Sequence, residues 1–564
     1  MMVPLSTRYM NALEEKVKQY IIREVFVRRN DARFVPETAN WIMDFRRICL
    51  DPEFLDVYTD IFFERFKDRY PFQVGGMEVA AIPLVAAIIM KMRERGMPVN
   101  GFFIRKSRKK TGLLKMIEGK LTDAPVVLID DLINTGTTID RQLKVLEASG
   151  KKVMTYFTIL RFRRLESYQR YQDEGIAIEA LFGLDEFTED LGTKLLDTKG
   201  SVITKERFQV KWYFKAPDAL LEAVVPKSGV VFDEKRVYSG SDRGILFALS
   251  RSDGSVMWTH RIGMGPWGSK RDKEIFSTPV LFDGRLYFGA YDGNVYCVEA
   301  ITGKRLWVSF EADWIAGSPV ADTEKKILYV PTIFGNQRDR GGLVAIDMLS
   351  GKARWRTRFP SAVRSTPLFV KEKRTIYVGS EDGMFFALES AEGKIRWSFQ
   401  SGGSIKDAPV YDQASQAIIF TSFDGGVYCL SATTGVLLWK FDIGLPNYSS
   451  PCLWEDRVFV ASLDKNLYCL DRKTGTRRWI FPARARIFSR PAVFRKKLYF
   501  GNNEARMREI DPETGKETGY FQCVERITNP VVYNGAEDEY YLQTYANEIY
   551  CLTERGEENL TEPK

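Results

Sequence analysis

Apolar residues follow two different periods along this chain of 564 residues. In roughly the first 195 residues, segments with apolar residues three and four positions apart alternate with short, continuous apolar runs. The helical spacing occurs in EEKVKQYIIREVFVR, PEFLDVYTDIFFERFKDRY and EVAAIPLVAAIIMKMRERG, and the runs PVVLID and VMTYFTIL are typical of buried strands. Strands that alternate with helices predict an α/β domain with a parallel sheet covered on both faces.

From about Val210 the chain changes to short strands separated by glycine-containing turns, and this pattern repeats. Typical units are YCVEAITGKRLW, FALESAEGKIRW and YCLDRKTGTRRW, in which a turn joins one strand to a second strand with a tryptophan. The tryptophan position is held by Trp258, Trp307, Trp355, Trp397, Trp439 and Trp479, and we expect Tyr520 to take it in the seventh unit. A repeat of roughly 40–50 residues is the length of a four-stranded blade and predicts an all-β propeller.

The two ends of the repeat region complement each other. The last unit, TNPVVYNGAEDEYYLQTYANEIYCL, has no tryptophan strand, whereas VKWYFK precedes the first full unit without inner strands of its own. Pairing the two fragments would satisfy the backbone hydrogen bonds of both edges. We therefore predict eight blades, the last one closed by the strand around Trp212. The predicted domains are residues 1–200 for the α/β domain and residues 206–564 for the propeller.

Composition and charge limit the cellular compartment and the partners that we expect for the protein. Charged residues make up 28% and hydrophobic residues 45% of the chain, as in soluble globular proteins. The formal net charge of +8 is shared by both parts, so neither is a basic tail and we expect no nucleic-acid partner. The first twenty residues hold no apolar run suited to secretion, and no stretch of about 18 apolar residues occurs. We expect a cytoplasmic protein with no membrane partner.

Cysteine and histidine usage limits metal and redox chemistry. Seven cysteines include no CxxC pair, so a zinc or dithiol site lacks support. Cys297, Cys429, Cys469 and Cys551 recur in one local context, which predicts a repeated buried position. The single histidine, His260, argues against a histidine-based triad or a multi-histidine metal site, and we expect it to be structural.

The candidate chemistry lies in Val126–Thr138. Four apolar residues lead into Asp130 and Asp131, and a loop then opens the helix IDRQLKVLEASG. Glycine in such a loop lets the backbone approach a ligand, and hydroxyls with free N–H groups at a helix N-terminus form a phosphate cradle. The acids at the carboxyl end of the strand could hold ribose hydroxyls and meet a magnesium ion. The cradle residues would be Asn134, Thr135, Gly136, Thr137 and Thr138.

A basic segment, Arg105–Lys110, lies upstream of this strand and contains five cations in six residues. It could be a solvated face or a nucleic-acid patch. Its position before Gly112 and IEG favours a loop that closes over a diphosphate, where positive charge stabilises a leaving group.

These segments resemble the type I phosphoribosyltransferases, and most closely orotate phosphoribosyltransferase, over about residues 35–195. VVLIDDLINTGTT is similar to the binding motif for 5-phosphoribosyl-1-diphosphate (PRPP), and FIRKSRKKTGLLKMIEG to the mobile catalytic loop. WIMDFRRICLDPEFL, VGGMEVAAIPLVAA and RRLESYQRYQDEGIAIEALFGLDEF resemble further segments of that family. The resemblance implies Lys106, Lys109 and Asp131 as catalytic residues. It implies that PRPP is bound by Arg105, Asp130, Asp131, Asn134, Thr135, Gly136, Thr137 and Thr138.

The acceptor half departs from that family. Ala80 stands where the diphosphate loop usually carries lysine, and Thr111 where the mobile loop often carries histidine. The Asp-Arg pair that helps to bind orotate aligns with Phe162-Arg163, which leaves Arg163 as the acceptor-binding candidate. The resemblance implies magnesium as cofactor, PRPP and a nucleobase-type acceptor as substrates, and a possible homodimer through the transferase domain.

Residues 210–555 resemble the propellers of quinoprotein dehydrogenases and of outer-membrane-assembly lipoproteins, the pyrroloquinoline-quinone (PQQ) type. Quinone enzymes of that kind often carry adjacent cysteines, and this chain has no Cys-Cys pair. We therefore expect no PQQ and regard the propeller as a platform for a protein partner.

Three functions remain open at this stage. The first is a magnesium- and PRPP-dependent phosphoribosyltransferase that acts on a nucleobase or a related acceptor. The second is a non-catalytic PRPP or nucleotide sensor that signals through the propeller. The third is a scaffold that keeps the fold without the chemistry, against which the two acids, the TGTT loop and the lysine loop all argue.

Overall fold

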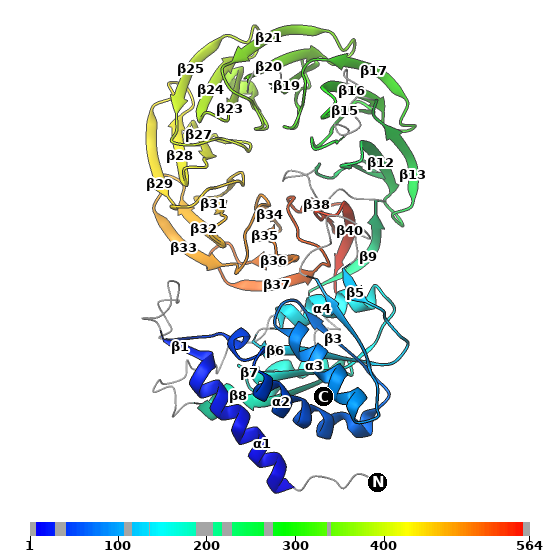
Figure 1. The fold of residues 1–564 in the computed structure, drawn as a ribbon. Helices are drawn as coiled ribbons and strands as arrows, with labels where there is room; N and C mark the ends of the chain where they lie inside the picture. The colour runs from blue at the N-terminus through cyan, green and yellow to red at the C-terminus, as the bar shows by residue number, and fades with distance from the viewer. Residues whose placement is uncertain are drawn as a thin grey trace. The chain divides into compact units, whose positions relative to one another are not determined.

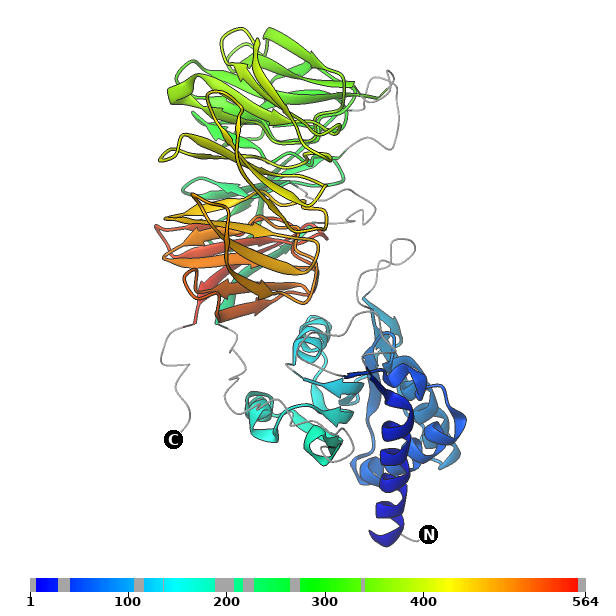
Figure 2. The same ribbon diagram turned by 90° about the vertical axis from the view of Figure 1, so that its left-hand side faces the viewer.

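The computed structural model describes residues 7–28, 41–105, 116–134, 136–187, 207–216, 228–263, 274–335 and 340–555. The chain divides into two compact units, residues 1–203 and residues 204–564. The first unit combines helices with a mixed sheet, and the second is a ring of blades (Figure 1). Figure 2 shows the ring from the side. The predicted fold class, an α/β domain joined to an eight-bladed propeller, is confirmed.

A six-stranded sheet with the order β5-β4-β3-β6-β7-β8 forms the centre of the N-terminal unit. Every neighbouring pair is parallel except β4 and β5, which is the pattern expected for strands joined by helices. A separate antiparallel pair joins β1 to β2. The strands are β1 (Phe26–Arg28), β2 (Trp41–Met43), β3 (Gln73–Met77), β4 (Asn100–Ile104), β5 (Ile117–Gly119), β6 (Val126–Ile133), β7 (Val153–Arg161) and β8 (Ala177–Gly183).

The helices of this unit shield the sheet from water. Asp51 caps the second helix by accepting a hydrogen bond from the backbone N–H of Phe54 at 2.9 Å, and Pro52 follows at its first position. Val127, Ile129 and Phe157 pack in one core with the first three helices. Because side chains alternate along a strand, Leu128, Asp130 and Tyr156 face the opposite side of the sheet. The α-helices are α1 (Thr7–Tyr20), α2 (Pro52–Phe66), α3 (Ala81–Glu94), α4 (Thr137–Glu147) and α5 (Gln169–Asp173).

Short helical segments join these elements. A π-helical turn, η1 (Ile21–Val25), continues α1, and the 3-10 segments are η3 (Phe45–Arg47), η4 (Lys67–Arg69), η5 (Leu165–Tyr168) and η6 (Leu184–Phe187). None of the helices in the part of the chain that the structure describes is long and apolar enough to span a bilayer.

The second unit consists of eight four-stranded antiparallel sheets. Within each blade the two middle strands are mostly buried, and the outermost strand alternates exposed and half-buried residues in most blades. Blades one to four are β10 (Val231–Phe232), β11 (Arg236–Gly240), β12 (Ile245–Ser250), β13 (Val256–Arg261); β14 (Val280–Phe282), β15 (Arg285–Gly289), β16 (Asn294–Glu299), β17 (Arg305–Phe310); β18 (Val320–Asp322), β19 (Ile327–Phe334), β20 (Arg340–Asp347), β21 (Ala353–Phe359); β22 (Leu368–Val370), β23 (Thr375–Gly379), β24 (Met384–Glu389), β25 (Ile395–Gln400). A 3-10 turn, η8 (Lys371–Lys373), joins β22 to β23.

The remaining blades continue this plan, except that the eighth takes its outermost strand from the start of the unit. They are β26 (Val410–Asp412), β27 (Ala417–Thr421), β28 (Gly426–Ser431), β29 (Leu437–Asp442); β30 (Cys452–Trp454), β31 (Arg457–Ala461), β32 (Asn466–Asp471), β33 (Arg477–Pro482); β34 (Ala492–Phe494), β35 (Lys497–Gly501), β36 (Arg506–Ile510), β37 (Glu517–Gln522); β38 (Val532–Asn534), β39 (Glu539–Gln543), β40 (Glu548–Glu554) and β9 (Phe208–Lys215).

Strand β9 closes the ring. It pairs antiparallel with β40, and Trp212 lies opposite Cys551 in that pairing (Figure 1). In the first blade Trp258 lies opposite Ala248, and in both pairings a one-residue bulge follows the residue opposite the tryptophan. The two tryptophans therefore occupy equivalent positions. Trp212 is 5% exposed, and its indole N–H donates to the carbonyl of Arg251 in the first blade at 2.8 Å.

The seventh blade differs from the sequence-based expectation. Tyr520 pairs with Arg508, whereas the residue in register with the tryptophans of the other blades is Gly519, opposite Glu509. The expectation that Tyr520 takes the tryptophan position was therefore wrong by one residue. A Cβ atom on Gly519 would lie 3.0 Å from Cβ of Arg207, so the glycine makes room for a side chain from outside the repeat.

The recurring cysteines are buried, as predicted, and His260 contacts the neighbouring blade. All seven cysteines are buried and free of disulfides, and Cys297, Cys429, Cys469 and Cys551 occupy the third strand of their blades. Nδ1 of His260 lies 3.0 Å from the carbonyl oxygen of Gly303, in the turn of the next blade. Burial lowers the pKa of His260, so the ring is neutral at physiological pH.

Candidate active site in the N-terminal unit

Strand β6 carries two acids at its carboxyl end, and the structure gives them different environments. Asp130 is 6% exposed, and both of its oxygens accept hydrogen bonds from the protein. Oδ2 accepts from the hydroxyl of Tyr156 on β7 at 2.6 Å, and Oδ1 from the backbone N–H of Asp131 at 3.0 Å. Asp131 is half-buried, and its Oδ1 accepts from the backbone N–H of Leu132 at 2.8 Å.

The two carboxyls influence each other's charge. Burial is the main reason that the pKa of Asp130 lies well above its usual value, and the neighbouring charge of Asp131 adds to the effect. The hydrogen bond from Tyr156 acts in the opposite direction. Burial and the charge of Asp130 in turn raise the pKa of Tyr156. Asp131, which is closer to solvent, is therefore the acid better placed to carry a negative charge toward a ligand.

A tight turn follows β6 and begins α4. Gly136 has φ of +81° and precedes the first helical residue, Thr137. A Cβ atom at this glycine would lie 2.1 Å from the hydroxyl of Tyr171, so only glycine fits both the backbone and the space. Thr137 is half-buried and Thr138 exposed in the first turn of the helix, where backbone N–H groups lack helical partners. This arrangement can hold a phosphate group.

A buried cluster behind the turn fixes its position. The hydroxyl of Tyr171 donates to Oδ1 of Asp140 at 2.7 Å and lies 3.2 Å from the carbonyl oxygen of Gly136. Arg170 donates to the same Asp140 oxygen at 2.7 Å and contacts the Tyr171 hydroxyl. Burial, followed by the charge of Asp140, raises the pKa of Tyr171, which keeps its proton in place for these bonds.

The segment between β2 and α2 lies close to the two acids. The guanidinium of Arg46 lies 2.7 Å from the carboxylate of Asp44. The hydrogen bond to Asp44 and the charge of Asp44 raise the pKa of Arg46, and the charge of Asp131 makes a smaller contribution. Burial raises the pKa of Cys49 to about 12, with further contributions from Asp131 and Asp130. These effects indicate that Arg46 and Cys49 lie near the end of β6.

The other candidate residues are placed in part. Arg105 at the end of β4 has its guanidinium 3.6 Å from Glu118 on β5, and its backbone N–H donates to the carbonyl of Met116 at 2.8 Å. Arg163 donates from Nε to Oδ1 of Asn134 at 3.2 Å, which brings these two candidates together. Lys106, Lys109 and Thr135 lie outside the described residues.

The acids fit a magnesium ion that is shared with a substrate. Among the described residues, no group of three or more His, Cys, Asp or Glu side chains could hold a metal by itself. Mg²⁺ is usually bound through one or two carboxylates together with substrate phosphates and water. The half-buried carboxylate of Asp131, next to a phosphate-type turn, matches that mode of binding.

Sequence reasoning missed the supporting side chains. The acids and the turn are held by four side chains, those of Tyr156, Asp140, Arg170 and Tyr171. All four lie outside the segment Val126–Thr138 in sequence and contact it only in the folded chain. The alternation of VMTYFTIL predicts that Tyr156 faces away from the core shared with α2. That signal alone does not identify its partner, because the pairing depends on the register between β6 and β7.

Comparison with curated proteins places the N-terminal unit. An orotate phosphoribosyltransferase from Bradyrhizobium sp. (strain ORS 278) is 25% identical over 182 residues, which cover 31% of this chain and 98% of the relative. One from Aquifex aeolicus is 27% identical over 149 residues, 26% of this chain and 81% of the relative. The N-terminal region is similar to orotate phosphoribosyltransferases. The similarity extends over nearly the whole length of the Bradyrhizobium enzyme, so it covers the N-terminal unit as a complete domain.

Comparisons also place the propeller. Residues 196–324 match a family described as outer membrane protein assembly factor BamB, and residues 339–562 match the β-propeller of the beta-alanine-activating enzyme. BamB from Moraxella catarrhalis aligns with 61% of this chain and 99% of its own, with a TM-score of 0.50 and 16% identity. A europium-containing methanol dehydrogenase aligns with 61% and 93%, with a TM-score of 0.53 and 13% identity. At these identities the structural likeness shows the fold alone.

Proposed function

We propose that this protein is a PRPP- and magnesium-dependent phosphoribosyltransferase that acts on a nucleobase or a related acceptor. The observation that carries the proposal is the end of β6, where Asp130 and Asp131 precede the Gly136 turn and the first turn of α4. A carboxylate and a phosphate-type turn on adjacent backbone suit a ligand that carries both ribose hydroxyls and phosphate. The similarity of this unit to orotate phosphoribosyltransferases supports the same conclusion.

In the proposed reaction, a ring nitrogen of the acceptor attacks C1 of the ribose. The bond between C1 and the diphosphate oxygen breaks, and its electron pair leaves with the diphosphate. Positive charge develops on the ribose and negative charge on the leaving group, so catalysis depends on positioning and electrostatic stabilisation. A single histidine in the whole chain is compatible with chemistry of this kind.

Each part of the site has a role in this proposal. Asp131 would hold the ribose hydroxyls, and bound magnesium would neutralise charge on the diphosphate. Asp130 has both oxygens engaged by Tyr156 and backbone, so it would position Asp131 and the strand end. The Gly136 turn, with Asn134, Thr135, Thr137 and Thr138, would hold the 5-phosphate. Lys106 and Lys109, assisted by Arg105, would stabilise the leaving diphosphate.

Arg163 is the acceptor-side candidate. Its bond to the Asn134 side chain at 3.2 Å supports this role, because it holds the guanidinium next to the turn that we propose for phosphate. Phe162 stands beside it in place of the acid expected from the family, and Ala80 stands in place of the diphosphate-loop lysine. These two positions favour an acceptor other than orotate.

A non-catalytic PRPP or nucleotide sensor is the second candidate, because the same two positions change the acceptor and diphosphate parts of the site. Calorimetric titration of the full chain with PRPP and MgCl₂ tests binding, and a diphosphate-release screen across purine and pyrimidine bases tests turnover. PRPP binding with turnover of one base supports the transferase. PRPP binding without turnover on any base supports the sensor, and absence of PRPP binding overturns both.

The setting that we propose is cytoplasmic, with a protein partner at the propeller and a homodimer through the transferase domain. Seven buried cysteines without disulfides suit a reducing compartment. A ring of blades with exposed outer strands gives a broad surface for a partner. Size-exclusion chromatography with light scattering tests the dimer.

A further inference from the structure

The propeller contains a cavity of about 250 Å³ at the inner ends of its blades. Its rim is formed by one residue from each blade, located two residues before the innermost strand in seven blades and three residues before it in the eighth. This volume is slightly below the range of about 300–1,000 Å³ that is typical of small-molecule sites. The eight rim residues are Gly229, Thr278, Ser318, Thr366, Ala408, Ser450, Arg490 and Asn529.

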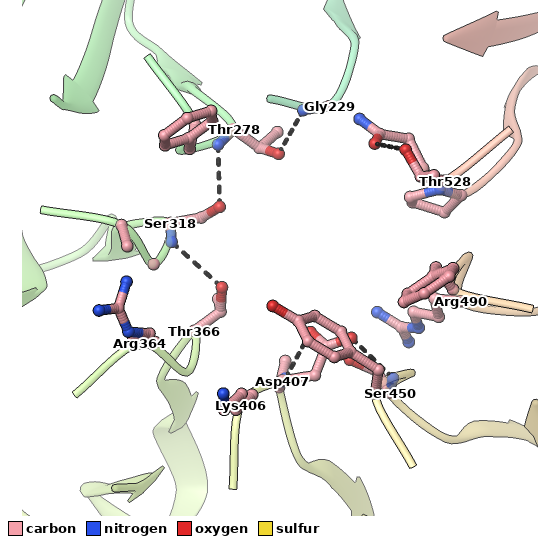
Figure 3. A pocket seen from close by; sticks show the side chains of 18 of the residues that line it. Gly229, Thr278, Ser318, Arg364, Thr366, Lys406, Asp407, Ser450, Arg490 and Thr528 are labelled. Atoms are coloured by element: carbon pink, nitrogen blue, oxygen red, sulfur yellow. Dashed lines mark hydrogen bonds between the residues drawn. The ribbon is translucent and has the colours of Figure 1, made fainter. Parts of the chain in front are cut away.

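One half of the rim is a regular chain of hydrogen bonds. The backbone N–H of Gly229 donates to the hydroxyl of Thr278 at 2.8 Å. Thr278 donates in the same way to Ser318 at 2.9 Å, and Ser318 to Thr366 at 3.1 Å. Each hydroxyl thus joins one blade to the next, and Figure 3 shows these bonds along one side of the cavity. This half of the rim has a structural role.

The other half breaks that chain. Ala408 has no hydroxyl, and Arg490 replaces the hydroxyl residue two blades further on. Asp407 stands where other blades carry serine, as in Ser365 and Ser489. It accepts from the backbone N–H groups of Ala408 and Ser450, both at 2.8 Å. Here charged side chains replace the small residues that suffice elsewhere for joining blades.

Positive charge is in excess around the cavity. Arg364, Lys406 and Arg490 line the cavity together with a single carboxylate, Asp407. Arg364 donates to Glu381 at 2.8 Å, and Lys406 lies 3.6 Å from the same carboxylate, so one acid serves two cations. Arg490 is exposed, and its charge acts on the neighbouring Asp407: burial raises the pKa of that carboxyl, and Arg490 works in the opposite direction. An arginine with five donors in a fixed fork is suited to phosphate.

Aromatic rings lie beside these cations. Phe276, Tyr291, Tyr448 and Phe488 line the same cavity. The hydroxyl of Tyr291 accepts from Arg364 at 2.8 Å, and the rings of Tyr448 and Phe488 are 5.7 Å apart, edge to face. Aromatic side chains in a cationic groove provide stacking surfaces for planar bases.

We propose that this cavity binds a nucleoside monophosphate, with its phosphate held by Arg490, Lys406 and Arg364 and its base against Tyr448 and Phe488. The anion site rests on the propeller residues alone. The choice of a nucleoside monophosphate rests on the proposed function, because phosphoribosyl transfer to a base produces this class of compound. The propeller would then bind the type of product that the N-terminal unit makes.

The test is calorimetric titration of the full chain with uridine and adenosine 5′-monophosphates, the matching nucleosides and inorganic phosphate. We expect at least one monophosphate to bind, with Kd raised roughly tenfold or more in Arg490→Ala, as for loss of a charge-assisted phosphate contact. Arg305→Ala, which removes an exposed arginine from the outer strand β17, is the matched control and should leave Kd unchanged. Binding should persist in Asp131→Asn, which alters only the N-terminal site.

Three results would overturn the inference: no binding of either monophosphate, equal binding by Arg490→Ala and the parent protein, or loss of binding in Asp131→Asn alone. Binding of inorganic phosphate as tight as that of the monophosphates would overturn the nucleotide assignment. The outcome is separable from the proposed function. Failure of PRPP to bind would remove the transferase, while binding that depends on Arg490 would still establish the cavity as a site.

Discussion

The guanidinium of Arg207 lies 3.2 Å from the carboxylate of Glu509 in the seventh blade. Glu509 pairs with Gly519, which occupies the position that tryptophan holds in the other blades. Glu509 is fully buried and also accepts hydrogen bonds from Tyr499 at 3.0 Å and Thr518 at 2.6 Å. The residues opposite the other tryptophans are alanine or cysteine. An ion pair therefore joins the seventh and eighth blades where an indole joins the others.

Arg207→Ala should destabilise the propeller by about 1–3 kcal/mol, because it leaves the buried Glu509 with neutral partners only. Urea unfolding followed by tryptophan fluorescence measures the loss. Arg305→Ala should have no comparable effect, since Arg305 lies on an exposed outer strand. Equal stability of Arg207→Ala and the parent protein would show that the pair contributes nothing to the joint.

Trp212→Ala should destabilise the propeller as much as Trp397→Ala does, by about 3–5 kcal/mol, as for other large-to-small core changes. Trp397 holds the same position within an internal blade and donates to Ala432 at 3.2 Å. Deletion of residues 205–216 should cost more than either substitution, because it also exposes the edge of β40. Thermal unfolding measures all three, and a Trp212→Ala protein as stable as the parent would argue against a role for β9 in ring stability.

Asp131→Asn should weaken PRPP binding at least tenfold in the presence of magnesium, because the amide removes the negative charge that would meet the ion and the ribose. The protein should remain folded, since Asp131 is half-buried and its hydrogen bond from Leu132 can be accepted by an amide oxygen. Calorimetric titration gives the affinity, and circular dichroism checks the fold. PRPP affinity equal to that of the parent protein would contradict the assignment.

Lys106→Ala and Lys109→Ala should lower turnover more than they weaken PRPP binding. Charge on the leaving diphosphate grows as the bond to C1 breaks, so a lysine that meets it acts mainly in the transition state. Steady-state and single-turnover rates, compared with PRPP affinity, measure the difference. Lys120→Ala, which removes a cation just after β5, is a control that should change neither quantity. A loss confined to binding would exclude a catalytic role.

Asp130→Asn should stabilise the N-terminal unit at about pH 8 and have little effect at about pH 3, where the parent carboxyl is mostly protonated in both states. Burial raises the pKa of Asp130 in the folded protein, so its protonation favours folding. That contribution is full below the unfolded pKa and is lost as the pH rises through the folded pKa. Each unit of the shift is worth about 1.4 kcal/mol. Thermal unfolding at the two pH values measures it, and a lower melting temperature of Asp130→Asn at pH 8 would contradict the prediction.

The fold could be predicted where the sequence pattern and the structure share one period. Repeated turns and tryptophans define the blades. The incomplete units at the two ends of the repeat region indicate that these two units join in one sheet. The error at Tyr520 arose because an aromatic residue was expected where tryptophan recurs. A count from the turn glycine leads instead to Gly519, four residues after Gly515, just as Trp479 follows Gly475.

The site could be predicted less completely. The order of strand, acids, glycine and helix located the end of β6, because these features are contiguous in sequence. The burial of Asp130 and its bond to Tyr156 depend on the register of two parallel strands, which no local pattern specifies. The cavity of the propeller was missed for a related reason. Its rim takes single residues from eight repeats, and Arg490 and Asp407 are exceptions to a pattern rather than a motif.

The bonds between blades have a consequence for how such a ring can change in length. Seven tryptophans donate their indole N–H to the next blade, and in every case the acceptor is a backbone carbonyl. The accepting residues are Arg251, Ala300, Met348, Ser390, Ala432, Arg472 and Pro512. Because any residue supplies a carbonyl, only the donor must be encoded, and the accepting position is free to vary. A whole repeat could therefore be duplicated or lost by recombination without breaking the connection between the blades that remain.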